Sequence, residues 1–286
     1  MLAASPVAEP RAAASDPARA GRIAIDQTRA LLTTAADGGI RHIEARPGDV
    51  ERVLGQSWPF PSPFGVSVRT LPASEGIARV EARARQSLER MGLPRGDTLI
   101  VGQATDLLGA EGGALWARLE GLKAAGLYRR IGFRARMSDG PLLLARRFSP
   151  DVVQVPASLL DQRVIRTGLV ESLATLGIEV QLCSLFHGGA IFAPSERLLV
   201  RPTEADMAMS RLRRRLAEAR LDPMQATLAF ALSQPGVAKV VVGAASAAEL
   251  RALMAAACAS APDLDWSVFA AEDMTGDSDD AIVSAA

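Results

Sequence analysis

Short apolar and β-branched runs alternate with longer stretches of helical periodicity along most of this chain, and this alternation restricts its fold more than any other feature. Strands that are each followed by a helix predict βα units around a parallel sheet. The predicted strands are residues 40–44, 64–69, 97–103, 129–133, 151–156, 178–183 and 238–243. Helical spacing over residues 26–37, 77–91, 113–125, 169–176 and 203–219 predicts helices in the gaps between the strands.

Seven strands with helices between them predict an α/β protein with a single (β/α)8 TIM barrel, and an eroded first strand fits within the N-terminal segment. We expect residues 1–20 to be a poorly ordered segment, residues 21–272 to form the barrel and residues 273–286 to be a flexible tail. A doubly wound open sheet is the alternative. It has less support because no glycine-rich dinucleotide fingerprint follows any of the strands.

Composition excludes several classes of protein. The 32 basic and 32 acidic residues cancel, so no basic surface for nucleic acid stands out. No apolar run is long enough for a bilayer helix, and the N-terminus lacks the pattern of a secretory signal. Cys183 and Cys258 lie far apart, without the spacing of a metal site or a disulfide framework. We therefore expect a reduced, soluble, cytoplasmic protein without a metal site.

Few residues are available for proton transfer near neutral pH. The chain has one tyrosine, two histidines and two lysines, which are Tyr128, His42, His187, Lys123 and Lys239. A mechanism that needs one of these residue types must use this short set.

Three segments together resemble the aldo/keto reductase family. Residues 152–194, from VVQVPASLL to FHGGAIFAP, are similar to the family's sixth strand and helix, its seventh strand and its cofactor loop. Residues 220–250 resemble its late helix, eighth strand and adenosine-binding helix, and residues 119–133 resemble its fourth helix and fifth strand. The likeness covers roughly residues 21–258 and again implies a barrel.

The resemblance implies a catalytic tetrad at the C-terminal mouth of the barrel, where a tyrosine phenol, tuned by a lysine–aspartate pair, protonates a carbonyl that accepts hydride. At the matching positions this chain has Glu44 for the aspartate, Gly48 for the tyrosine, Arg69 for the lysine and Gln103 for the histidine. A guanidinium cannot be tuned like an ammonium group, and glutamine does not titrate. We therefore expect no carbonyl reduction by the family mechanism. Glu44 and Arg69 either form an ion pair that holds two strands or contact a ligand.

The cofactor half of the family site is better retained. The resemblance implies that the following residues contact a dinucleotide: Gln154, Ser158, Cys183, Ser184, Leu185, Phe186, His187, Gly189, Gly243, Ser246 and Glu249. A carboxylate at Glu249 would repel a 2′-phosphate but can accept a hydrogen bond from a ribose hydroxyl, so NAD(H) is expected over NADP(H). Other interpretations stay open. Gln154 could have a buried polar partner, and Cys183 could be an inert core thiol.

The resemblance extends to degenerate members of the family that regulate cell division. It implies an NAD(H)-binding, catalytically inactive regulator with three partners, which are an FtsZ-type division GTPase, a DivJ-type histidine kinase and an AAA+ protease. The protease would recognise the C-terminal Ala285 and Ala286. The protein would be cytoplasmic and recruited to the division site. An NADH-dependent oxidoreductase that uses His187 or Glu44 as its acid, and a purely structural interaction protein, are the alternatives.

Overall fold

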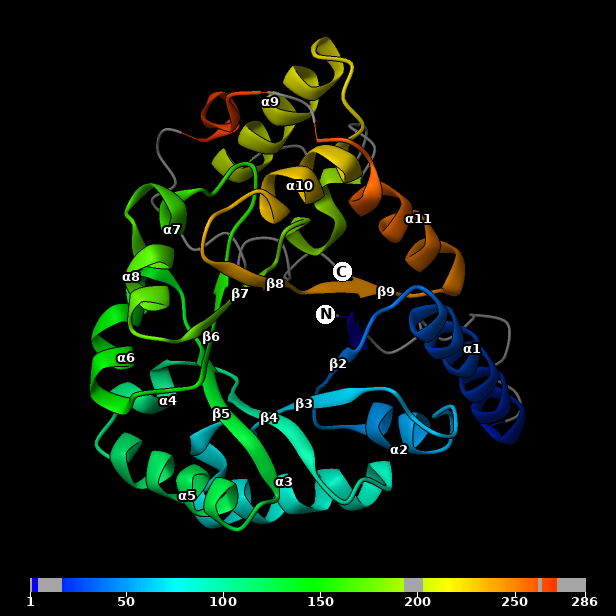
Figure 1. The fold of residues 1–286 in the computed structure, drawn as a ribbon, viewed down its shortest axis with the longest axis vertical. Coiled ribbons are helices and arrows are strands. Elements are labelled where there is room, and N and C mark those ends of the chain that lie inside the picture. The colour runs from blue at the N-terminus through cyan, green and yellow to red at the C-terminus, as the bar shows by residue number, and fades with distance from the viewer. Residues whose placement is uncertain (1, 5–16, 193–202, 262–263, 272–286) are drawn as a thin grey trace.

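The computed structural model describes residues 2–4, 17–192, 203–261 and 264–271, and within them strands surround a central axis and helices cover the outside (Figure 1). The predicted tail at residues 273–286, with its expected degradation tag at Ala285 and Ala286, lies outside the described residues. The sheet has nine segments in the order β8-β7-β6-β5-β4-β3-β2-β1-β9, all paired in parallel.

The strand segments of this sheet, in chain order, are β1 Leu2–Ala4, β2 His42–Ala45, β3 Gly65–Arg69, β4 Gly96–Val101, β5 Tyr128–Arg134, β6 Val152–Pro156, β7 Glu179–Cys183, β8 Val237–Val240 and β9 Val242–Ala244. β8 pairs with β7, whereas β9, one residue further along the chain, pairs with β1. The ring is therefore closed, and the predicted (β/α)8 barrel is confirmed over an open doubly wound sheet.

The helices are α1 Pro17–Asp37, α2 Asp49–Gly55, α3 Ile77–Met91, α4 Thr105–Leu108, α5 Gly112–Ala124, α6 Pro141–Phe148, α7 Arg163–Arg166, α8 Leu169–Thr175, α9 Glu204–Glu218, α10 Pro223–Leu232 and α11 Ala247–Cys258. Short 3₁₀ turns occur at η1 Ala73–Glu75, η2 Met137–Asp139, η3 His187–Phe192 and η5 Trp266–Phe269. None of the helices in the described ranges is long and apolar enough to cross a membrane.

Local sequence accounts for where these helices begin and end. In α3, Val80, Ala84, Leu88 and Met91 recur at helical spacing and are buried, and the helix ends at Gly92, whose φ of +64° suits glycine. The Asp222 side chain caps α10 immediately before Pro223. α1 begins at Pro17, earlier than the predicted start at residue 26, because Pro at the first helical position followed by Ala and Arg favours a helix.

Two regions of the sheet differ from the predicted pattern. The single strand predicted at 238–243 is interrupted at Val241, whose backbone N–H donates to the Leu182 carbonyl at 2.8 Å, so that β8 and β9 pair with different neighbours. The first strand, Leu2–Ala4, occupies the N-terminal segment where room for one was expected. It is short, and pairing on both sides inserts it between β2 and β9.

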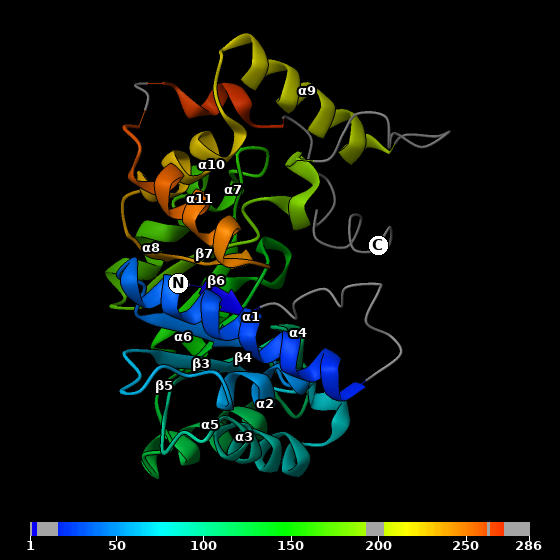
Figure 2. The same ribbon diagram turned by 90° about the vertical axis from the view of Figure 1, so that its right-hand side faces the viewer.

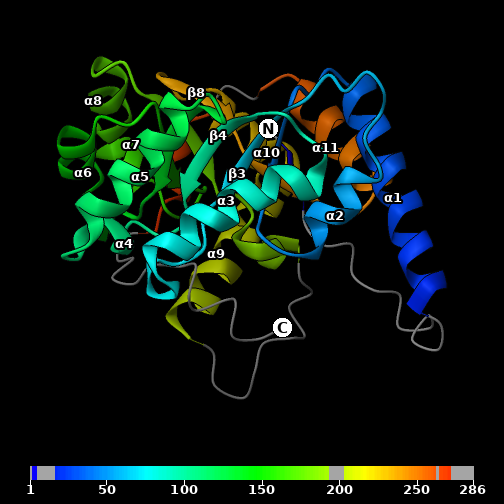
Figure 3. The same cartoon turned by 90° about the horizontal axis from the view of Figure 1, so that it is seen from below.

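The parallel strands all direct their C-terminal ends to one side of the barrel, which we call the mouth, and the opposite side is the floor. α1 packs against α11 on the outer wall (Figure 2). α9 contacts η3, which follows β7, and thus lies on the mouth side, where it projects beyond the other helices (Figure 3). Loops at the mouth of such barrels carry the functional groups, so we expect the functional site of this chain at the mouth.

Candidate active-site region at the barrel mouth

Alternate residues of a barrel strand point inward, and in this barrel many of them are charged or polar. At the floor, Arg130 of β5 forms ion pairs with Asp97 and, at 2.7 Å, with Glu179 of β7. Lys239 of β8 reaches Glu179 at 2.6 Å. His42 lies near this group, and burial followed by the field of Lys239 lowers its pKa. The floor is therefore closed by ion pairs.

Two glutamines connect the floor to a buried carboxylate nearer the mouth. Gln181 donates to Glu179 at 2.6 Å, and Gln154 donates from one amide nitrogen to Gln181 at 3.0 Å and to Glu44 at 2.6 Å. Glu44 also pairs with Arg69 at 2.6 Å. The Gln154 Oε1 atom is buried and has no hydrogen-bond partner within the described residues. A continuous polar network thus runs up the barrel interior.

The predicted ion pair between Glu44 and Arg69 is confirmed. The two residues lie on the neighbouring strands β2 and β3, and the Glu44 side chain is fully buried while that of Arg69 is 12% exposed. The sequence left open whether Gln154 has a buried polar partner. It has two, because it donates to both Glu44 and Gln181. Gln103, which the sequence resemblance matches to the family's histidine, is exposed just beyond β4.

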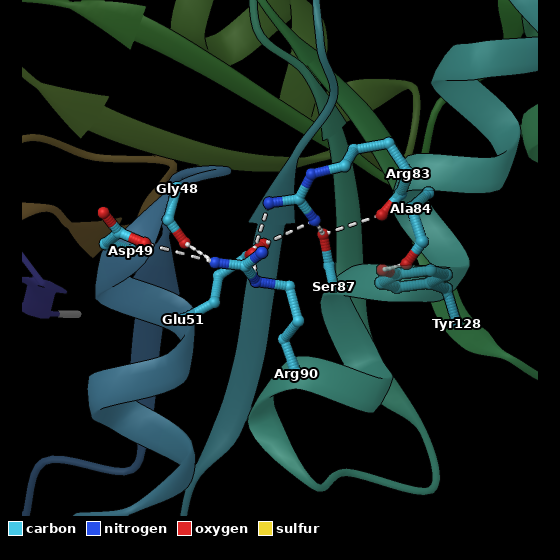
Figure 4. Close-up of polar contacts among 8 residues, drawn as sticks. All are labelled: Gly48, Asp49, Glu51, Arg83, Ala84, Ser87, Arg90 and Tyr128. Atoms are coloured by element: carbon cyan, nitrogen blue, oxygen red, sulfur yellow. Dashed lines mark hydrogen bonds and ion pairs between the residues drawn. The ribbon is translucent and has the colours of Figure 1, made fainter.

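Gly48, which the sequence resemblance matches to the family's tyrosine, lies in the loop between β2 and α2. Its carbonyl accepts a hydrogen bond from Arg90 of α3 at 3.1 Å (Figure 4). Its φ of +157° and ψ of −163° belong to a region that glycine occupies readily and other residues rarely. A Cβ at this position would meet nothing within 4 Å, so backbone conformation, and not space, restricts the residue type.

A buried carboxylate that the sequence analysis missed fixes the helix after Gly48. Glu51 of α2 is fully buried and pairs with Arg83 and, at 3.3 Å, with Arg90, both of α3 (Figure 4). Arg83 also donates to the buried Ser87 at 2.8 Å. No local signal marks Glu51, since acidic residues are common in the first turn of a helix and its partners are more than thirty residues away.

The chain's single tyrosine lies away from the mouth. Tyr128 begins β5 at the floor end, is almost fully buried and donates its hydroxyl to the Ala84 carbonyl of α3 at 2.7 Å (Figure 4). Burial raises the pKa of its phenol far above the ordinary value. Lys123 pairs with Asp151 at 2.6 Å, and Lys239 pairs with Glu179. The only tyrosine and both lysines therefore have structural partners at the floor end of the barrel.

The loop after β7, predicted to hold a pyrophosphate, has an unusual backbone. Ser184 and His187 have positive φ values of 59° and 48°, and Gly188 and Gly189 follow with 61° and 91°. Non-glycine residues in this region are strained by about 1 kcal/mol or more, and such strain is concentrated at functional sites. The His187 ring lies 2.6 Å from the Ser158 hydroxyl and is buried, so it joins this loop to the one after β6.

Neighbouring atoms leave room on one side of this loop. A Cβ at Gly189 would meet nothing within 4 Å. Leu185 is buried in the core and Phe186 packs on Phe192, with ring centroids 5.3 Å apart. Cys183 is buried at the end of β7. The apolar residues of the predicted set therefore anchor the loop, while Gly189 faces open space.

The segment after β9, predicted to contact adenosine, is exposed. The Ser246 side chain caps α11 by accepting from the Glu249 N–H at 3.1 Å, and the Glu249 carboxylate accepts from the Ala245 N–H at 2.7 Å. Gly243 lies on β9 and is also exposed. Because β6, β7 and β8–β9 are consecutive in the ring, Ser158, the Ser184–Gly189 loop and Ser246 lie on adjacent sectors of the mouth.

Several polar residues near the mouth have structural partners. Asp161 forms a two-bond ion pair with Arg163 at 2.8 and 2.6 Å. Gln162 donates to the Leu159 and Trp266 carbonyls at 2.9 and 2.7 Å. On the basic helix α9, Arg213 binds the carbonyls of η3 and Arg215 binds that of Val268. Among the described residues, no group of three His, Cys, Asp or Glu could hold a metal ion.

Arg134 and Arg46 at the mouth were also not predicted as site residues from the sequence. Arg134 ends β5 and donates to the Ser184 hydroxyl at 2.8 Å. Arg46 follows β2 and lies within the electrostatic influence of Arg69, Glu44, Arg134 and Cys183. The signal that could have found them is their position, since each is an even number of residues beyond an inward-facing residue of its strand, Glu44 or Arg130.

A closed parallel barrel with strained, glycine-rich loops at its mouth belongs to the (β/α)8 class that holds ligands at the C-terminal ends of its strands. The family model described as "Aldo/keto reductase family" matches residues 17–270, and the chain belongs to this family. No curated protein sequence compared with the chain matches it.

Solved structures show the same fold at low sequence identity. The holo form of the aldo-keto reductase AKR11C1 from Bacillus halodurans has a TM-score of 0.65 and 18% identity, with 89% of this chain and 87% of that chain covered. PA4992 from Pseudomonas aeruginosa has a TM-score of 0.61 and 20% identity, with 90% and 89% covered.

Proposed function

We propose that this chain binds NAD(H) without reducing a carbonyl substrate and acts as a regulator of cell division and cell-cycle signalling through protein partners. One observation carries the proposal. The chain's only tyrosine donates to the Ala84 carbonyl at the floor end of the barrel, so no phenol is available at the mouth. The charge pair that remains there, Glu44 with Arg69, joins two strands, and a guanidinium does not release a proton near neutral pH.

The groups that would hold a dinucleotide are located on adjacent parts of the mouth. The Gln154 Oε1, which lacks a partner within the described residues, could accept from a carboxamide, and the open face at Gly189 would admit a pyrophosphate to the backbone of the Ser184–Gly189 loop. Glu249, beside Ser246 and Gly243, would face the adenosine ribose and disfavour a 2′-phosphate. When bound, a nicotinamide cofactor supplies hydride chemistry, but the residues described here would only bind and orient it.

The altered tetrad at Glu44, Gly48, Arg69 and Gln103, together with the SLFHGG loop, makes the chain similar to KidO, an oxidoreductase-like division regulator. On that likeness, the proposed partners are an FtsZ-type division GTPase and a DivJ-type histidine kinase, with turnover by an AAA+ protease through Ala285 and Ala286. NAD(H) can regulate the chain only if it binds one conformation or one complex more tightly than another. A ligand with equal affinity for two states does not change their populations.

The experiment has two stages. NADH binding is measured by nucleotide fluorescence with the wild-type chain and Gln154→Leu, and NADH oxidation is then followed over a panel of aldehydes and ketones. We expect saturable binding that Gln154→Leu weakens, and no turnover. Co-sedimentation with FtsZ polymers, with and without NADH, then tests the regulatory part. Steady NADH oxidation with any carbonyl, or no NADH binding at all, would contradict the proposal.

An NADH-dependent oxidoreductase with different catalytic groups is the second candidate, and the buried contact between His187 and Ser158 favours it. An imidazole with one nitrogen 2.6 Å from a hydroxyl at the mouth is an arrangement that can move a proton. If this candidate is correct, carbonyl-dependent oxidation of NADH will be present in the wild-type chain and absent from His187→Gln.

A further inference from the structure

Among the described residues, two arginines, Arg46 and Arg69, lie beside one carboxylate, Glu44, on the β2–β3 side of the mouth. Arg69 and Glu44 lie across β2 and β3, where Ala45 is in register with Val68, so the next step along the two strands places Arg46 beside Arg69. Arg134 of β5 is in register with Gln154 of β6, which contacts Glu44 from the other side. Arg69 therefore contacts the buried carboxylate of Glu44, strand register places Arg46 next to Arg69, and Arg134 lies within the electrostatic influence of Arg46.

That carboxylate already has one partner at each oxygen. One oxygen of Glu44 accepts from Gln154 at 2.6 Å, and the other is 2.6 Å from Arg69. Glu44 carries a single negative charge. It compensates the positive charge of Arg69, so the charge of Arg46 is not compensated by this carboxylate. The Arg69 Nε atom is buried and has no hydrogen-bond partner within the described residues, so a donor remains on the residue at the centre of the group.

The electrostatic environment of Arg46 supports this description. Arg46 is exposed by its accessible surface, yet the protein around it partly desolvates the guanidinium and lowers its pKa, and the fields of Arg69 and Arg134 act in the same direction. Glu44 and Cys183 act in the opposite direction and do not cancel the effect. Clustered guanidinium groups repel one another unless an anion lies between them, and their planar forks match the two oxygens of a carboxylate.

We propose that Arg46 and Arg69, with Arg134 beside them, form a binding site for a small organic dianion, a dicarboxylate, at the mouth of the barrel. Two carboxylates suit the site because each guanidinium fork can bind one of them. Arg46 and Arg69 lie on the β2–β3 side of the mouth, whereas the loops predicted to hold a dinucleotide follow β6, β7 and β9. Arg134 of β5 contacts one of these loops, because it donates to Ser184. The inference does not depend on NAD(H) binding.

The test is calorimetric titration of the full chain with succinate in low-salt buffer without nucleotide, alongside succinamide, which has the same length without the charges. We expect saturable succinate binding and none of succinamide. Arg46→Gln should weaken succinate binding about tenfold, as expected for the loss of a charged hydrogen bond. Arg46→Lys, which keeps the charge without the fork, should fall between the wild type and Arg46→Gln.

Arg52→Gln is the matched control, because Arg52 is exposed on α2 and its loss changes the net charge equally. Its succinate affinity should equal that of the wild type. Absence of saturable succinate binding, equal binding of succinamide, or equal weakening by Arg52→Gln and Arg46→Gln would each overturn the proposal. Because no nucleotide is present, these outcomes are independent of whether NADH binds.

Discussion

The Arg69 guanidinium lies 2.6 Å from the buried carboxylate of Glu44, across the neighbouring strands β2 and β3. The sequence resemblance matches these two positions to the family's lysine and aspartate, and in the structure the two side chains form a charge pair. A buried pair of this kind contributes little compared with an apolar pair of the same size, but removing one partner leaves the other charge without compensation.

Arg69→Met should therefore lower the free energy of unfolding by about 3 kcal/mol, since it leaves Glu44 buried and unpaired. The double variant Glu44→Gln with Arg69→Met should be more stable than Arg69→Met alone. Urea unfolding of the single and double variants measures both values. The control is Arg79→Met, which breaks the exposed pair between Arg79 and Glu75 and should cost less than about 1 kcal/mol. A double variant no more stable than Arg69→Met would contradict the account.

Gly48 offers a test of backbone strain in the loop between β2 and α2. Gly48→Ala should destabilise the fold by about 1 kcal/mol or more, because the φ of +157° disfavours a Cβ although space is open. Gly121→Ala, in the exposed middle of α5 with equally open space and no positive φ, should instead stabilise it by about 0.5 kcal/mol. Thermal unfolding measures the stability change of each variant. Equal stability changes in the two variants would show that the positive φ of Gly48 does not disfavour alanine there.

Much of the fold, but less of its long-range contacts, could be predicted from the sequence. The seven strands and the barrel could be predicted because apolar runs alternate with helical stretches along the chain. Buried parallel strands have such continuous apolar runs. The contact between Gln154 and Glu44 joins residues 110 positions apart, and only closure of the ring brings them together. Glu51 looked like an ordinary first-turn acid, and its burial depends on Arg83 and Arg90 of another helix.

Strand order alone is enough to bring the predicted loops of the site to one part of the barrel mouth. The loops after β6, β7 and β9 lie together because strand order places them together. Spacing within a strand could have marked Arg46 and Arg134 as inward-facing, but only the register between strands shows that Arg46 lies next to Arg69.

Acid should weaken the floor of the barrel. Burial alone would raise the pKa of Glu179, but hydrogen bonds from Lys239, Gln181 and Arg130 lower it from 4.5 to about 2. A carboxylate with a depressed pKa in the folded state stabilises the fold above its unfolded pKa, and the contribution disappears as the pH falls from 4.5 to about 2. The loss is on the order of 2 to 3 kcal/mol. Urea unfolding between pH 7 and 2.5 should show it, and Glu179→Gln should have a flatter profile; parallel profiles would contradict this role.

The preference between cofactors should depend on Glu249. We expect NADH to bind at least about fivefold more tightly than NADPH, because a carboxylate near the 2′-phosphate costs about 1 kcal/mol in water. Glu249→Gln keeps an acceptor for the Ala245 N–H but removes the charge, so the ratio should fall toward one. Fluorescence titration with both nucleotides measures the ratio. Glu218→Gln, an exposed change on α9, is the control and should preserve the wild-type ratio. An unchanged ratio in Glu249→Gln would assign the preference to other groups.

Cellular lifetime should depend on the last two residues if the C-terminus is a degradation tag. Small, uncharged terminal residues can enter the pore of an AAA+ unfoldase, whereas carboxylates there disfavour recognition. We therefore expect Ala285→Asp combined with Ala286→Asp to lengthen the half-life severalfold after synthesis is stopped, as measured by immunoblotting. Asp279→Ala combined with Asp280→Ala changes the same tail without touching its end, and should leave the half-life close to that of the wild type. Equal half-lives for the wild type and the variant with both terminal alanines replaced would exclude those alanines as the recognition signal.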